Sequence, residues 1–299
     1  MSKRRSGALA AALVLAAAGC GGGGDGGRER TPAPRGASPS ASPLPEPNGT
    51  LAKDPRGLAE DLNRTHRALG PAVDEWLRGD PRRTGPPAAV VHLALRQQRL
   101  YRVLAKDRGL ERRTVARLPE AVAGQTRDDV TAVRKLLELA KPADDLGKFR
   151  TEEPPPAGVL LKHFEDAGKR FGVDWQVLAA IMLVETKYGR VRSPSWAGAQ
   201  GPMQFMPATW RQYGMDGDIR DPRDAVMGAA NYLKSSGAPD DYRQALHAYN
   251  PTPLYVEAVQ RHARRMREDP RAYYAYYNWQ VFVVTTRGDV RITGPGARR

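Results

Sequence analysis

Val173–Trp210 carries the densest pattern in the chain, reading V-D-W-Q-V-L-A-A-I-M-L-V-E-T-K-Y-G-R at its start and W-A-G-A-Q-G-P-M-Q-F-M-P-A-T-W at its end. The first half predicts an apolar helix, with Asp174 as its N-cap and Gly189 as its C′ residue. Spacings of three, four and three residues place four side chains on one face. They are Trp175, Leu178, Met182 and Glu185.

Glu185 is then a lone carboxylate in the last turn of a hydrophobic helix. Burial disfavours the ionised form, and the negative end of the helix dipole acts in the same direction. A carboxyl group that stays neutral near pH 7 can serve as a general acid. The alternative is an ordinary half-exposed or ion-paired glutamate, for which Lys187 and Arg190 are the candidate partners.

The segment Gly198–Pro207 is too rich in glycine for an ordinary helix and too apolar for a free loop. It predicts a wall on which a flat ligand rests. Gln204 would supply a hydrogen-bonding side chain, and Met203, Phe205 and Met206 would supply apolar surface. The alternative is a buried connector whose methionines fill the core.

Four motifs occur in order along the second half of the chain. They are E-T-K-Y-G from Glu185, G-A-Q-G-P-M-Q-F-M-P-A-T-W from Gly198, A-Y-N at Ala248–Asn250 and Y-V-E-A-V at Tyr255–Val259. Together they resemble the lytic murein transglycosylases, the soluble and membrane-bound group with a goose-lysozyme-like domain. The resemblance covers roughly residues 157–268 and implies a mainly α fold with a lysozyme-like helical catalytic domain.

The resemblance implies one catalytic carboxyl group, and Glu185 matches it. In this family the Glu protonates the glycosidic oxygen between N-acetylmuramic acid and N-acetylglucosamine in peptidoglycan, while the substrate's acetamido group supports the oxocarbenium-like centre. The ionised Glu then takes the proton of the muramic C6 hydroxyl, which attacks C1 and leaves a 1,6-anhydromuramoyl end. The alternatives are a hydrolytic muramidase and a non-catalytic peptidoglycan-binding lipoprotein.

The same resemblance implies substrate-binding roles for other side chains. Gln204 would contact acetamido or hydroxyl groups of the substrate, and Met203 and Met206 would form an apolar platform for a sugar.

A second group of implied site residues lies around these motifs. Tyr249 and Asn250 match a Y-N pair beside the catalytic carboxyl group, which a Tyr hydroxyl can orient. Ser193 lies near a family Ser, although the segment before Gly198 differs in length from the family's pattern. Tyr255 is expected in the core.

Most glycosidases use two carboxylates, and no second one stands out here. Asp221 suits a helix N-cap, Pro222 the N1 position, and Asp224 the first turn. We therefore expect these carboxylates to be structural, like Asp216 and Asp218 in the preceding turn.

The net charge of +14 indicates an anionic partner. No nucleic-acid-binding motif occurs, so anionic wall polymers are favoured over nucleic acid. The five histidines lack metal-ligand spacing and only one cysteine is present, so we predict no metal and no cofactor.

Met1–Cys20 combines a basic start, an apolar run too short to cross a bilayer, and a small-residue cleavage site. It resembles a bacterial lipoprotein signal, with Cys20 as the lipidated first mature residue. The alternative is an ordinary secretory signal with a chance Cys. The prediction is an exported lipoprotein on the outer face of the cytoplasmic membrane, held there by lipid.

Composition divides the chain into six segments. They are the signal peptide 1–20, a disordered Gly/Pro/Ser tether 21–50, an Arg-rich helical region 51–141, a Pro-rich linker 142–156, the transglycosylase-like domain 157–270 and a β-hairpin tail 271–299. The Arg-rich region is either a helical support packed on the catalytic domain or a module that binds the wall or a partner.

Patterning also predicts individual elements. Helices are expected at Pro87–Lys106 and near Val159–Phe171, and Thr126 with Asp129 resembles the capping box of a third. Alternation within residues 272–292 predicts the strands of the hairpin, with a turn at 287–289. The four tyrosines between 273 and 277 would close the open side of the domain or stack on sugars.

Overall fold

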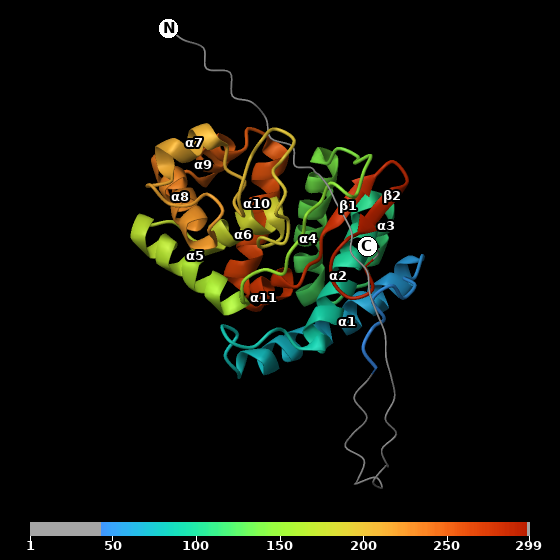
Figure 1. Ribbon diagram of the computed structural model, residues 1–299. Helices are drawn as coiled ribbons and strands as arrows, with labels where there is room; N and C mark the ends of the chain where they lie inside the picture. The colour runs from blue at the N-terminus through green and yellow to red at the C-terminus, as the bar shows by residue number, and fades with distance from the viewer. Residues whose placement is uncertain (1–42, 298–299) are drawn as a thin grey trace, which may run out of the picture.

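The computed structural model describes residues 43–297, so the predicted signal peptide and Cys20 lie outside the described part of the chain. Within this range the protein is mainly helical, with eleven helices followed by one two-stranded antiparallel hairpin (Figure 1). The predicted fold class, mainly α with a small C-terminal hairpin, is confirmed. No helix in the described range is long and apolar enough to cross a bilayer.

The first four helices come from the predicted Arg-rich region. They are α1 (Pro55–Leu77), α2 (Ala88–Lys106), α3 (Arg108–Val115) and α4 (Glu120–Leu139). The prediction for α2 is confirmed to within one residue, because Pro87 is its N-cap.

The predicted start of α4 is wrong. Thr126 and Asp129 lie in the middle of the helix, which begins after Pro119. Both side chains are buried, and the Asp129 carboxylate accepts a hydrogen bond from the Tyr276 hydroxyl. A tertiary contact therefore uses the carboxylate that the local pattern assigned to capping.

Residues 43–50 also differ from the prediction of a disordered tether. This stretch lies against α2, where Arg96 donates to the Gly49 carbonyl at 3.2 Å and Arg99 donates to the Pro47 carbonyl at 3.1 Å. Arginines of the helix thus hold the segment through its backbone carbonyl groups.

Seven helices follow the proline-rich linker. They are α5 (Ala157–Phe171), α6 (Trp175–Thr186), α7 (Pro207–Tyr213), α8 (Pro222–Ser235), α9 (Tyr242–Tyr249), α10 (Pro253–Glu268) and α11 (Arg271–Tyr277). Gly172 ends α5 in the left-handed region with φ 67°, as a C-terminal glycine should. Asp221 caps α8 as predicted, accepting from the backbone N–H groups of Arg223 and Asp224.

Helix α6 is buried on nearly every side, not along one stripe. Leu178 and Met182 are fully buried, while Trp175 and Glu185 at the two ends are half-buried. The cause is the number of neighbours, because α5, α8, α10 and α11 all contact this helix. Its apolar composition on all faces fits that position.

The end of α6 also departs from prediction. Asp174 is the N-cap residue, but its side chain makes no capping hydrogen bond. At the other end the helix stops at Thr186, and Lys187, Tyr188 and Gly189 all have positive φ. The left-handed turn therefore begins two residues before the predicted glycine.

The hairpin is shorter than predicted and starts later. β1 (Phe282–Thr285) pairs with β2 (Gly288–Arg291), and Gly288 pairs with Thr285, so the turn lies one residue earlier than predicted. The preceding tyrosines form α11 instead of a strand and are buried. They pack on several sides at once, as side chains on a helix can; Tyr273, for example, packs edge-on against Phe164 and Trp175.

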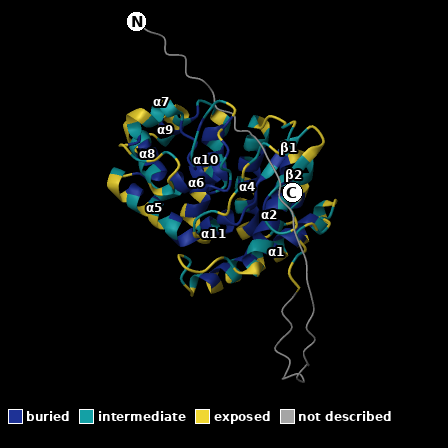
Figure 2. Ribbon diagram, in the orientation of Figure 1, coloured by how far each residue is buried: buried dark blue, intermediate teal, exposed yellow. Residues whose placement is uncertain are grey.

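One hydrophobic core extends from the first helices to the residues before the hairpin. It includes Leu58 of α1, Val130 of α4, Ile181 of α6 and Trp279. Figure 2 shows the buried segments gathered where α4, α6, α10 and α11 meet. The linker is fixed to this body by two backbone hydrogen bonds, from Glu152 N to the carbonyl oxygen of Arg190 and from Arg192 N to that of Arg150.

Candidate active site

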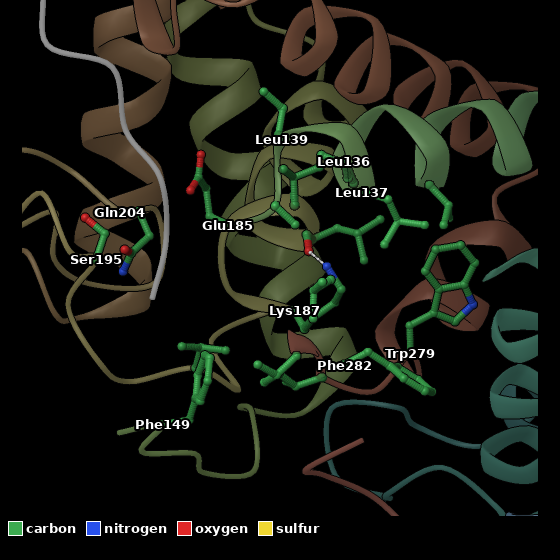
Figure 3. Close-up of a pocket in the computed structure, with 18 of the residues that line it drawn as sticks. Leu136, Leu137, Leu139, Phe149, Glu185, Lys187, Ser195, Gln204, Trp279 and Phe282 are labelled. Atoms are coloured by element: carbon green, nitrogen blue, oxygen red, sulfur yellow. Dashed lines mark hydrogen bonds between the residues drawn. The ribbon is translucent and has the colours of Figure 1, made fainter. Parts of the chain in front are cut away.

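A pocket with a volume of about 250 Å³ opens at the C-terminal end of α6. Figure 3 shows Glu185 and Lys187 projecting into it from that helix end, with Gln204 on one side and Trp279 and Phe282 on the other. Its walls also include the last turns of α4 and residues of the linker. The site is therefore built by parts of the chain that lie far apart in the sequence.

Glu185 is the single carboxylate among the described residues that line this pocket. The side chain is half-buried, and desolvation raises its pKa from the ordinary value of 4.5 to about 7. The Tyr255 hydroxyl and the positive charge of Lys187 act in the opposite direction but are outweighed. Burial thus keeps a large fraction of this carboxyl group protonated near neutral pH.

The two basic residues proposed as partners of Glu185 are engaged elsewhere. Arg190 pairs with Glu153 at 3.2 Å and donates to the Tyr277 carbonyl at 3.1 Å. The Lys187 ammonium donates to the Leu183 carbonyl at 2.8 Å. Within residues 43–297 Glu185 forms no ion pair, so the alternative of an ordinary ion-paired glutamate is contradicted.

Tyr255 is the site residue that sequence reasoning missed. Its side chain is 2% exposed and belongs to the core, as expected, but its hydroxyl lies close enough to Glu185 to lower the carboxyl pKa. This hydroxyl has no well-formed hydrogen bond in the described part of the chain. A buried, unsatisfied donor beside a carboxyl group is available to stabilise the carboxylate when it ionises. The Y-V-E-A-V motif was the signal that could have found it.

Tyr249 contacts a different group from the one expected. Its hydroxyl donates to the Met203 carbonyl at 2.7 Å, so it holds the Gly198–Pro207 segment in place instead of orienting Glu185. Its ring stacks parallel to that of Tyr255 at 6.5 Å between centroids. Tyr249 is absent from the pocket lining, and its hydrogen bond is structural.

Gln204 and Asn250 both line the pocket, as the resemblance implied. The Gln204 side-chain amide donates to the Gly201 carbonyl at 2.9 Å, and its backbone has φ 51°. The buried side-chain oxygen of Asn250 has no hydrogen-bond partner in residues 43–297. An acceptor left unsatisfied in a pocket wall is free to receive a donor from a ligand.

The remaining predicted residues do not form the surface that was expected. Met203 is fully buried and is absent from the pocket lining, as is the half-buried Met206. Ser193 does line the pocket, but its hydroxyl accepts from Arg150 N at 2.7 Å and donates to the Lys148 carbonyl at 3.2 Å. It holds the linker against the segment that follows α6.

Gly201 is the glycine on which this wall depends. It has φ 74°, and a Cβ atom there would lie 1.8 Å from the Ile219 carbonyl oxygen. Only glycine can occupy the position. Gln200 pairs with Phe205 across the resulting turn, which sets the position of Gln204 at the pocket edge.

Residues 162–271 match the family described as the transglycosylase SLT domain. The chain contains a transglycosylase SLT domain. The domain includes Glu185, Gln204, Asn250 and Tyr255, but not the pocket walls from α4, the linker and the hairpin. In the described part of the chain, no cluster of three or more His, Cys, Asp or Glu side chains is arranged to hold a metal ion.

Three proteins with similar sequences can be compared with this SLT domain protein. Membrane-bound lytic murein transglycosylase F of Thiobacillus denitrificans is 30% identical over 122 residues, which cover 38% of this chain and 26% of that protein. Membrane-bound lytic murein transglycosylase F 1 of Alkalilimnicola ehrlichii is 31% identical over 126 residues, covering 40% and 24%. Membrane-bound lytic murein transglycosylase B of Escherichia coli is 28% identical over 145 residues, covering 30% and 40%.

The chain thus spans only about a quarter of the two F-type relatives and 40% of the B-type relative. No solved structure matches the chain.

Proposed function

We propose that this protein is a peptidoglycan lytic transglycosylase. It cleaves the β-1,4 bond between N-acetylmuramic acid and N-acetylglucosamine and leaves a 1,6-anhydromuramoyl end. The observation that carries the proposal is Glu185, the single carboxylate that the described residues bring to the pocket, whose pKa is raised by burial to about 7. The SLT domain and the names of its relatives point to the same substrate.

A carboxyl group with a pKa near the working pH can both give and take a proton. Neutral Glu185 protonates the glycosidic oxygen as the bond from that oxygen to C1 breaks. The ionised Glu185 then accepts the proton of the C6 hydroxyl as the C6 oxygen bonds to C1. The proton count closes without water, so one carboxylate suffices where hydrolysis by most glycosidases uses two.

The neighbouring side chains support the two states of Glu185 differently. The Tyr255 hydroxyl stabilises the carboxylate that exists between the two proton transfers, because a hydrogen bond donated to a charged oxygen is stronger than one donated to the neutral acid. Asn250, whose side-chain oxygen has no hydrogen-bond partner in residues 43–297, and Gln204 would bind hydroxyl and acetamido groups of the glycan. Ser193 acts indirectly, by holding the pocket wall.

We also propose that the protein is exported and anchored by lipid on Cys20, facing the wall from the outer side of the cytoplasmic membrane. The sequence pattern of residues 1–20 supports this location. Metabolic labelling with a fatty acid tests it: a Cys20→Ser variant should lose the label and be released from membranes, whereas retention of the label would contradict it.

The activity is tested by incubating purified sacculi with the protein and measuring released soluble fragments. Glu185→Gln should lower the release at least about a hundredfold, since it removes the only proton donor of the mechanism. The matched control is Glu165→Gln, which changes an exposed glutamate of α5 and should leave the rate unchanged.

Binding of sacculi without release of fragments by the unaltered protein would favour the non-catalytic reading. Fragments that carry reducing ends in place of anhydro ends would favour a hydrolytic muramidase on the same site.

A further inference from the structure

The pocket continues beyond Glu185 into a part that the SLT domain does not build. Its walls there are Leu137 of α4, Phe149 of the linker, and Phe282 and Val284 of β1, all outside residues 162–271. We call this part the apolar arm. Lys187 lines it, and Figure 3 shows Lys187 with Leu137 on one side and Phe282 on the other.

Lys187 is the half-buried pocket cation that forms no ion pair within residues 43–297. Arg102 also lines the pocket, but it pairs with Asp289 at 2.7 Å and lies over the Phe282 ring at 4.7 Å. Lys141 is exposed and lies over the Trp196 ring at 4.2 Å. Lys187 makes no ion pair within residues 43–297, and the only hydrogen bond of its ammonium group to the described chain is the one to the Leu183 carbonyl.

This arrangement is unfavourable in the absence of a ligand. An ammonium group carries three N–H donors, and within the described part of the chain only one of those of Lys187 is used. Burial and the nearby charge of Arg102 lower the pKa of Lys187 to about 8, which measures the cost of holding the charge there. The backbone adds strain, because Lys187 has φ 53° in a region that favours glycine. A negative group from a ligand would relieve the electrostatic part of this cost.

Glu185 does not supply that negative group. Within residues 43–297 the two side chains form no ion pair: the Lys187 ammonium donates to the Leu183 carbonyl, and Figure 3 shows the Glu185 carboxylate turned toward a different part of the pocket. Asp289, the nearest acidic residue of the hairpin, is already held by Arg102 and Lys106. An apolar cleft with a half-buried cation that forms no ion pair within residues 43–297 therefore fits a ligand with short apolar groups and a carboxylate.

We propose that the apolar arm binds the peptide stem of the glycan substrate and that Lys187 receives a carboxylate of that stem. This proposal rests on the proposed function, because the stem must be attached to the glycan held at Glu185. Lys187 is then a specificity-determining residue, and the Arg-rich region and the hairpin supply walls that restrict the enzyme to glycan bearing stems.

The test compares two ligands that differ only in that charge: a short glycan with free stem carboxylates, and the same glycan with those carboxylates amidated. Binding is measured by calorimetry on the Glu185→Gln background, so that no ligand is cleaved. The Glu185→Gln protein should bind the free-carboxylate ligand about tenfold more tightly than the amidated one, the size of one charge-assisted hydrogen bond.

Adding Lys187→Met should abolish this difference, leaving both ligands bound like the amidated one. Lys187→Arg should retain part of it, and Lys234→Met, which changes an exposed lysine of α8, should leave it intact. Thermal unfolding of each variant checks that the fold persists.

The proposal is overturned if Lys187→Met weakens both ligands equally, or if the protein with Lys187 intact does not distinguish them. Binding does not require turnover, so failure here is separate from failure of the proposed function. If the protein releases anhydro fragments but binds both ligands equally, the proposed activity is supported and the role of Lys187 is contradicted. A protein that prefers the free stem carboxylate but never cleaves glycan would support the role of Lys187 and contradict the proposed transglycosylase activity.

Discussion

Replacing Glu185 by Gln should make the protein more stable, and increasingly so as the pH rises. The folded state raises the pKa of this carboxyl group from 4.5 to about 7 by desolvation. Below pH 4.5 the group is neutral in both the folded and unfolded states, so it does not change the unfolding free energy. Between pH 4.5 and about pH 7 the unfolded chain releases the proton while the folded protein keeps it, so the protein loses stability as the pH rises.

The size of the effect follows from the two pKa values. Each tenfold change in proton affinity corresponds to about 1.4 kcal/mol, so the cost levels off near about 3 kcal/mol above pH 7. Glutamine is uncharged at every pH and avoids this cost. The difference in unfolding free energy between the variant and the parent should therefore grow by roughly 2–3 kcal/mol from pH 5 to pH 8.

Urea unfolding at a series of pH values measures this difference, and groups common to both proteins cancel in it. Glu165→Gln, which changes an exposed glutamate of α5, is the control. A flat curve for Glu185→Gln would mean that the pocket does not hold the carboxyl group protonated. The argument for a single acid and base would then fail.

Three further substitutions test the site. Tyr255→Phe removes the hydroxyl that lowers the pKa of Glu185, so the midpoint of the rate against pH should move upward and kcat should fall about tenfold. Tyr249→Phe removes the bond to the Met203 carbonyl; it should lower the unfolding free energy by about 1 kcal/mol and leave that midpoint unchanged. Gly201→Ala should cost about 3 kcal/mol or more in chemical denaturation, whereas Gly124→Ala, in an open helical position, should stabilise by about 0.5–1 kcal/mol.

Local signals predicted the elements that local chemistry decides. Gly172 and Asp221 end and begin their helices as expected, because a left-handed C-terminal glycine and an aspartate N-cap act within a few residues. The burial of Glu185 could be predicted for a similar reason. A carboxylate within an apolar helix is desolvated by the residues of that helix and its neighbours, whichever elements they are.

Features set by distant contacts could not be read from the sequence. Asp129 lies inside α4 because Tyr276, far along the chain, donates to it. The alternation within residues 272–292 predicted strands, yet its first part, up to Tyr277, belongs to α11, whose tyrosines are buried against the core. The apolar arm is the clearest case, since Leu137, Phe149 and Phe282 belong to three predicted segments and meet only in the folded protein.

The most direct test of the account is to digest sacculi in water enriched in oxygen-18 and to analyse the new glycan ends by mass spectrometry. If Glu185 directs the C6 hydroxyl to C1, the ends are 1,6-anhydromuramoyl and carry no heavy oxygen. Reducing ends that each carry one heavy oxygen would show that water attacks C1. The intramolecular transfer proposed for this pocket would then be wrong.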